Sequence, residues 1–91
     1  MIYVALLRKE PTSDYAVDFP DFPGCVTAGK SPAEAQRMAI EALELHIEGM
    51  LEDAEPLPKP LTLNSAMTES RNRSAVAFLV ESAKSKLANT S

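Results

Sequence analysis

The segment Ser31-Pro32-Ala33-Glu34 marks the start of a long helix, and this helix constrains the fold more than any other feature of the sequence. The segment has a hydroxyl at the N-cap, a proline at the first helical position and a glutamate at the third, which together form a capping box. Apolar residues then recur at helical spacing as far as Ala54. Because the residue before a proline avoids helical dihedral angles, Pro56 stops the pattern. The sequence therefore predicts one helix over about residues 32–53.

The outer face of this helix is acidic. Its stripe consists of Glu41, Glu44, Glu48 and Glu52, and we interpret it as a solvated surface. Gly49 interrupts the helix at a cost of about 1 kcal/mol relative to alanine. Close approach of a neighbouring backbone would be a reason for a glycine there.

Three short apolar segments precede the helix and are predicted to be strands, at residues 2–8, 14–19 and 24–28. A short connection makes the first two a hairpin. The first strand is apolar on both faces, which predicts a central position in the sheet. Since one helix covers only one side of a small sheet, we expect the other side to associate. The simplest arrangement is a two-fold homodimer, and a partner protein is the alternative.

The chain after the helix is harder to assign. Residues 55–60 alternate proline with other residues and should be extended and stiff, and residues 61–72 are polar and weakly patterned. Residues 75–87 fit a strand or a helix equally well, because periodicity does not separate the two for a short apolar run. The length of 91 residues predicts a single domain, assigned to residues 1–82, with a tail at 83–91 that is compatible with a short helix.

Composition narrows the class of protein. Apolar residues make up 45% of the chain and charged residues 24%, as in ordinary globular proteins. The net charge of −4 argues against a domain that binds nucleic acid as a whole. The single cysteine excludes an internal disulfide and fits a reducing compartment. With neither a signal peptide nor a membrane-spanning run, the sequence predicts a soluble cytoplasmic domain.

The segment Asp18-Phe19-Pro20-Asp21-Phe22-Pro23 repeats an Asp-Phe-Pro unit and is the most unusual stretch of the sequence. Phe19 is in phase with the core-facing side of the second strand, which indicates a structural role. Phe22 has no such phase and lies on a stiff segment beside two carboxylates, as a hot spot for a basic partner would. A stiff structural corner is the alternative. We take Asp18, Asp21, Phe22 and Pro23 as candidate partner-binding residues.

No other residue points to chemistry. His46 has no companion ligand at helical spacing, and Cys25 has no adjacent cation that would lower its pKa. RNase H-type nucleases need converging carboxylates that begin with an acid on the first strand, but residues 1–9 contain neither Asp nor Glu. We therefore predict no enzymatic activity, no catalytic residues, no metal ligands and no cofactor.

The order of these features resembles the HicB antitoxin family, also described as HicB-like proteins with a partial RNase H fold. The resemblance rests on the Phe-Pro corner, the Pro-Gly-Cys-Val-Thr segment at Pro23–Thr27, the capped helix and the Pro-x-Pro-x-Pro segment at Pro56–Pro60. It covers about residues 1–60, with looser agreement as far as Val80. The P-G-C element followed by a capped helix at this spacing is specific, although each piece alone is weak.

The resemblance implies an α+β fold of β-β-β-α-β order, in which a long helix covers one face of a small, mainly antiparallel sheet. It implies a fourth strand at residues 75–81. It also implies that the protein binds and neutralises a small basic HicA-type toxin, which cleaves messenger RNA with a histidine. An acidic partner would compete with RNA for that toxin's surface. Many members continue into a DNA-binding domain, and since this sequence ends at Ser91 we expect no such domain here.

Two other functions stay open. The chain would be a DNA-binding autoregulator if residues 72–87 formed a helix of a ribbon-helix-helix unit. It would be a nuclease if acids from several strands converged on metal ions. A second long helix would favour the regulator, and metal-dependent cleavage would favour the nuclease.

Overall fold

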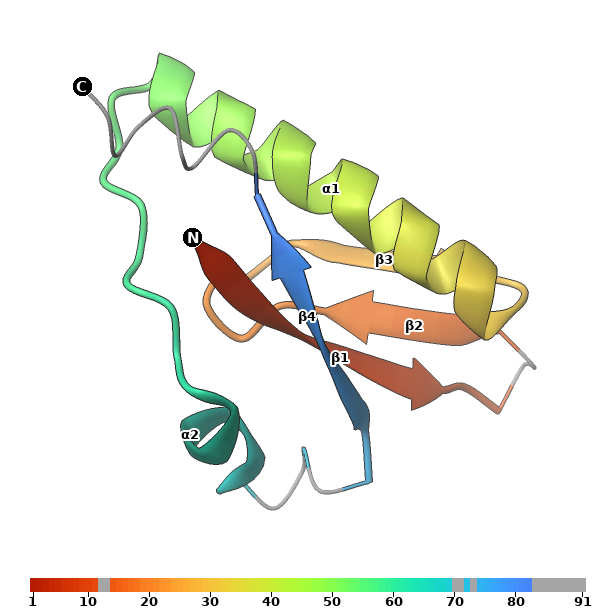
Figure 1. The fold of residues 1–91 in the computed structure, drawn as a ribbon. Coiled ribbons are helices and arrows are strands. Elements are labelled where there is room, and N and C mark those ends of the chain that lie inside the picture. The colour runs from red at the N-terminus through yellow and green to blue at the C-terminus, as the bar shows by residue number, and fades with distance from the viewer. Residues whose placement is uncertain (12–13, 70–71, 73, 83–91) are drawn as a thin grey trace.

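The computed structural model describes residues 1–11, 14–69, 72 and 74–82, and has a long helix lying across one face of a four-stranded antiparallel sheet (Figure 1). The elements follow in the order β1 (Ile2–Lys9), β2 (Tyr15–Asp18), β3 (Val26–Gly29), α1 (Pro32–Glu52), α2 (Leu63–Met67) and β4 (Val76–Glu81). The predicted α+β class and the order of the four strands and the long helix are confirmed.

β1 is a central strand, as its two apolar faces predicted. The sheet order is β3-β2-β1-β4, so β1 pairs with β2 on one side and with β4 on the other. Side chains alternate across the sheet, and Tyr3, Ala5 and Leu7 therefore join the core under α1. Val4 and Leu6 face the opposite side and are also buried.

α1 begins where the capping box predicted. The Ser31 hydroxyl accepts a hydrogen bond from the backbone N–H of Glu34 at 3.1 Å, and Pro32 is the first helical residue. The buried face of the helix is narrow and consists of Ala35, Ala39, Leu43 and Ile47. Gly29 lets the first turn approach β3, because a Cβ built on Gly29 would lie 2.5 Å from the backbone nitrogen of Ala35. Leu45 lies outside this face and is 69% exposed.

One element after α1 was not predicted, and a segment that the pattern left open between strand and helix is a strand, as the resemblance implied. The polar segment at 61–72 contains a short helix, α2, which begins when the Thr62 hydroxyl accepts a hydrogen bond from the N–H of Ser65 at 3.1 Å. The ambiguous segment forms β4, so the helix that a ribbon-helix-helix unit would need is absent from residues 76–81.

Two further bounds can be compared with the sequence analysis. The third strand begins at Val26 rather than at Gly24. The predicted tail at 83–91 lies outside the described residues.

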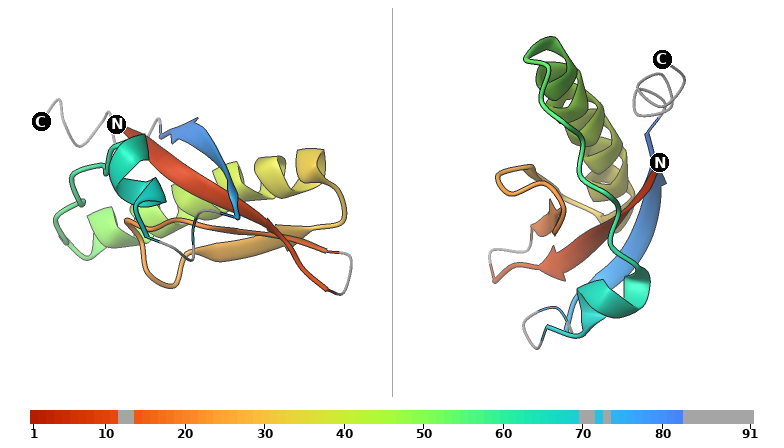
Figure 2. Two further views of the ribbon diagram at one scale, coloured as in Figure 1. Left: turned by 90° about the horizontal axis from the view of Figure 1, so that it is seen from below. Right: turned by 90° about the vertical axis from the view of Figure 1, so that its left-hand side faces the viewer.

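The second face of the sheet is partly covered by the chain itself. α2 packs there, on the side opposite α1 (Figure 2), and Val4, Leu6, Ala66 and Ala75 form a small second core. α2 supplies part of the cover that a second copy was expected to give to this face, and the homodimer stays a prediction. Within the described residues, no helix is both long enough and apolar enough to cross a membrane.

Candidate partner-binding surface

The repeated Asp-Phe-Pro unit forms two successive tight turns. The Phe22 N–H donates to the Phe19 carbonyl oxygen at 3.0 Å, and the Cys25 N–H donates to the Phe22 carbonyl oxygen at 2.9 Å. Each turn therefore starts at a phenylalanine and has a proline second, where the fixed φ of proline is suited to a β-turn. Gly24 stands third in the second turn with a φ of 90°, a value that side-chain-bearing residues rarely adopt. The repeat encodes the turn pair that leads from β2 to β3.

Phe22 is buried, and the prediction that it is an exposed aromatic is wrong. Its side chain is 2% exposed, and its ring packs edge-on against Tyr3 with the centroids 4.7 Å apart. The ring of His46 on α1 packs against its other side at 5.5 Å. Strand alternation ends at Phe19, and the two turns then bring Phe22 back into the core under α1. Phe19 is buried as expected, at 2% exposure.

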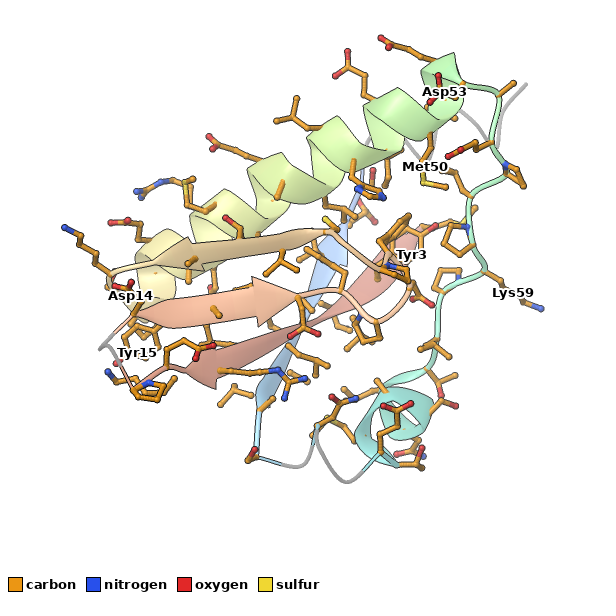
Figure 3. All side chains as sticks on the ribbon, turned by 180° about the vertical axis from the view of Figure 1, so that it is seen from behind. Tyr3, Asp14, Tyr15, Met50, Asp53 and Lys59 are labelled. Atoms are coloured by element: carbon orange, nitrogen blue, oxygen red, sulfur yellow. The ribbon has the colours of Figure 1, made fainter. Side chains whose placement is uncertain are left out.

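Tyr3 and Asp21 attach the proline-rich segment to the sheet. The Tyr3 hydroxyl donates to the Pro58 carbonyl oxygen at 2.9 Å, and an Asp21 carboxylate oxygen accepts from the Leu61 N–H at 3.0 Å. Figure 3 shows Tyr3 facing this segment and Lys59 pointing away from it. Burial, and secondly the negative charge of Asp21, raise the pKa of Tyr3 above its ordinary value. Asp21 therefore has a structural partner within the chain.

Asp18 belongs to a polar chain on the opposite face of the sheet from α1. Its carboxylate accepts from Arg8 Nε at 2.9 Å, and Arg8 Nη2 donates to the Asn72 side-chain oxygen at 2.6 Å. Asn72 is 3% exposed and donates through Nδ2 to the Ala66 carbonyl oxygen at 2.7 Å. This chain joins β1 and β2 to α2. Sequence reasoning missed Arg8 and Asn72, because only the strand register and α2 bring them to Asp18.

The same face stays exposed over β2 and β3. Asp18 lies opposite Val26 and Ala16 opposite Ala28 in the strand register, so these four side chains share one surface, which we call the outer β2–β3 face. Val26 is 63% exposed and Ala28 is exposed. Pro23, also exposed, precedes β3 in the second turn. Of the four predicted residues, Asp18 lies on this face, Pro23 leads into it, and Asp21 and Phe22 hold the turns that precede it.

The remaining candidates have structural surroundings. Cys25 is buried, and burial raises the pKa of its thiol above the ordinary value of 9.0, so its reactive thiolate is disfavoured. His46 is part of the ring contact with Phe22. Across the part of the chain that the structure describes, no group of three or more His, Cys, Asp or Glu side chains is arranged to hold a metal ion.

Comparison with known proteins gives consistent results. Residues 3–91 match the family model described as the HicB-like antitoxin of bacterial toxin–antitoxin systems. The antitoxin HicB of Escherichia coli K12 is 38% identical over 65 residues, which cover 71% of this chain and 47% of that protein. An uncharacterized 14.9 kDa protein from the rep-hol intergenic region of Haemophilus phage HP1 is 37% identical over 89% of this chain and 60% of its own length. The chain thus spans about half the length of these two relatives.

Solved structures show the same fold. The N-terminal domain of the Burkholderia pseudomallei antitoxin HicB has a TM-score of 0.81 at 27% identity, covering 89% of this chain and 96% of that domain. A chain of the HicA3 and HicB3 toxin–antitoxin complex has a TM-score of 0.74 at 30% identity, with 89% of this chain and 96% of that chain covered.

Proposed function

The chain belongs to the HicB-like antitoxin family, and from that membership we propose that it binds and neutralises a small basic mRNA-cleaving toxin of the HicA type. The observation that carries this proposal is the family match over residues 3–91. It is supported by the similarity to a chain solved within a toxin–antitoxin complex, at a TM-score of 0.74.

Neutralisation works through shape and charge. A toxin that binds RNA presents a basic surface to the phosphates, and this chain has a net charge of −4. Opposite net charges accelerate encounter, and a folded protein seated on the toxin's RNA surface excludes the RNA sterically. The acidic stripe on α1 contributes to this field, because Glu41, Glu48 and Glu52 are exposed.

We assign the toxin contact to the outer β2–β3 face together with Pro23. The face offers an exposed aliphatic centre at Val26, and the partly exposed carboxylate of Asp18 lies beside it. A desolvated apolar anchor with an acceptor at its rim is the usual composition of an interface hot spot. Phe22 and Asp21 act indirectly, because they fix the turns from which Pro23 and β3 emerge.

The function is tested by co-expression with the product of the neighbouring open reading frame and co-purification of the two proteins. The surface is tested with Val26→Lys, which puts a cation facing a basic partner and should weaken the complex at least about tenfold. The matched control is Leu45→Lys, at a similarly exposed position on the outer side of α1. If Leu45→Lys weakens the complex and Val26→Lys does not, the toxin docks on α1 and this assignment of the surface is wrong. If the two proteins do not co-purify at all, the function is wrong.

A further inference from the structure

Arg8 lies at the border between the outer β2–β3 face and α2. It stands opposite Ala16 in the strand register, so its side chain projects from the same side of the sheet as Asp18. Its guanidinium bonds to Asp18 through Nε and to Asn72 through Nη2. A cation at the border of a surface that faces a basic toxin calls for an explanation, because like charges across an interface oppose binding.

Asn72 is a fixed support for the Arg8 guanidinium. Its N–H donates to the Glu69 carbonyl oxygen, and its carbonyl oxygen accepts from the Ala75 N–H, both at 3.0 Å. Its buried side chain donates through Nδ2 to the Ala66 carbonyl oxygen, while Oδ1 accepts from Arg8. Asn72 is thus bonded through its backbone and its side chain at once, and it holds the guanidinium in one orientation.

Arg8 in turn fixes the carboxylate of Asp18. The Arg8 Nε–H takes one carboxylate oxygen, Oδ1, at 2.9 Å. Among the described residues the other oxygen has no hydrogen-bond partner, and 34% of the Asp18 side chain is exposed, so this oxygen is open to an outside cation. An unsupported surface carboxylate samples several rotamers, and ordering it on binding lowers the affinity. The Asp18 carboxylate is already ordered before a partner arrives.

We propose that Arg8 is a positioning residue for toxin binding, which holds Asp18 ready for a cation of the toxin although its own charge opposes a basic partner. The inference rests on the proposed antitoxin function and on the outer β2–β3 face as the contact surface. The planar guanidinium has two donors that bridge Asp18 and Asn72, and lysine has no such fork. Orientation outweighs one unit of unfavourable charge, because a partly exposed charge acts mainly through screened, long-range steering.

Charge and positioning predict opposite results when Arg8 is replaced. Arg8→Met makes the chain one unit more negative, and on charge alone it should bind purified toxin from the neighbouring open reading frame more tightly. We expect it instead to bind about three- to tenfold more weakly, the usual penalty for ordering one more side chain at an interface. The loss should appear in the dissociation rate, where most effects of interface changes lie.

Two further variants separate the charge of Arg8 from its geometry. Arg8→Lys keeps the charge but loses the fork, so it should also weaken the complex, and it tests the inference even if Arg8→Met fails to fold. The matched control is Lys9→Met, which removes the same charge from the next residue of β1. Lys9 Nζ lies over the Tyr15 ring, and its side chain projects from the α1 side of the sheet. This control should bind the toxin as tightly as the parent protein or more tightly.

A double-mutant cycle tests whether Arg8 acts through Asp18. The toxin dissociation constant is measured for Arg8→Met, Asp18→Asn and the double variant, and thermal unfolding verifies that each is folded. In the Asp18→Asn background, Arg8→Met should change the affinity less than about twofold, because the carboxylate that it orients is gone. A loss of equal size in both backgrounds would mean that Arg8 supports the fold in general, and would overturn the inference.

The outcomes also separate this inference from the proposals beneath it. Arg8 variants that bind as tightly as the parent protein, while Val26→Lys weakens the complex, leave the surface standing and overturn the positioning role alone. A parent chain that does not bind the toxin at all overturns the antitoxin proposal, and this inference with it.

Discussion

Phe22 joins the two layers of the molecule at the point where the chain turns twice. Its ring fills the space between Tyr3 on β1 and His46 on α1, and almost none of it reaches solvent. An aromatic side chain in such a place contributes stability, because its truncation leaves a cavity that rigid neighbours cannot fill. The turn hydrogen bonds around it are short and regular, so the corner is held by both backbone and side-chain contacts.

We predict that Phe22→Ala lowers the free energy of unfolding by about 3–5 kcal/mol, as core aromatic truncations do. Phe19→Ala should cost a similar amount, since both rings are buried to the same degree. Urea denaturation of each variant measures the loss, and the exposed change Val26→Ala, expected to cost less than about 1 kcal/mol, is the control. A Phe22→Ala variant as stable as the parent protein would show that the Phe22 ring does not stabilise the turns between β2 and β3.

The raised pKa values of Tyr3 and Cys25 predict a loss of stability at alkaline pH. In the folded protein both groups hold their protons more tightly than in the unfolded chain, mainly because burial disfavours the anion. Their contributions are complete below the unfolded values of 9.0 for Cys25 and 10.0 for Tyr3, and are lost as the pH rises through the folded pKa values.

Urea midpoints measured across this range should fall from about pH 9 upward, and Cys25→Ala should remove the first part of the fall. Tyr3→Phe should flatten the part above pH 10, although it also loses the hydrogen bond to Pro58. If Tyr3→Phe falls as steeply as the parent protein there, another group is responsible.

Gly29 and Gly49 differ in the space around them, and the difference locates the contact between α1 and the sheet. Gly29 on β3 has no space for a methyl group, since its Cβ would lie 2.5 Å from the backbone of Ala35. Gly49 has nothing within 4 Å of the same position, so the expectation that a close neighbouring backbone explains Gly49 is wrong. The close approach of helix and sheet occurs at the first turn of α1 and not near its end.

The two substitutions to alanine should therefore have opposite signs. Gly29→Ala forces backbone against backbone and should destabilise the protein by about 2 kcal/mol or more. Gly49→Ala should stabilise it by roughly 0.5–1 kcal/mol, the usual gain in an open helix interior. Thermal unfolding of both variants makes the comparison, and equal effects would mean that α1 does not contact β3 as described.

The sequence predicted those helices and strands that are specified by residues close together in the chain. The capping box gave the start of α1, and apolar alternation gave β1 and β2 to within a residue or two. α2 was missed because it has five residues in a polar segment, with a threonine cap that looks like an ordinary loop. β4 fits a strand or a helix from its pattern, and β1 decides the outcome by pairing with six of its residues.

The candidate surface was only partly predictable for a related reason. The Phe-Pro repeat identified the correct corner. The alternation of inward and outward side chains along β2 does not continue through the two turns, so the sequence did not predict the burial of Phe22. Val26 came to notice only through the register that sets it opposite Asp18. Contacts between distant segments, such as Arg8 with Asn72, leave no trace in local spacing.

The net negative charge of the whole chain should make its binding to a basic toxin sensitive to salt. Its complex with a basic toxin should form more slowly and bind less tightly as ionic strength rises, because screening removes the long-range attraction. Asp18→Asn together with Asp21→Asn should reduce that salt dependence. Binding kinetics with the purified toxin at several salt concentrations measure the effect, and association that is indifferent to salt would exclude steering by charge.

Suppression of RNA cleavage tests the antitoxin role most directly. Purified toxin from the neighbouring open reading frame is mixed with messenger RNA and increasing amounts of this chain, and RNA cleavage is followed with time. We predict that cleavage stops near a one-to-one ratio, and that the chain alone cleaves no RNA with magnesium or manganese. Cleavage at an undiminished rate with excess folded chain, or metal-dependent cleavage by the chain alone, would contradict the proposed function.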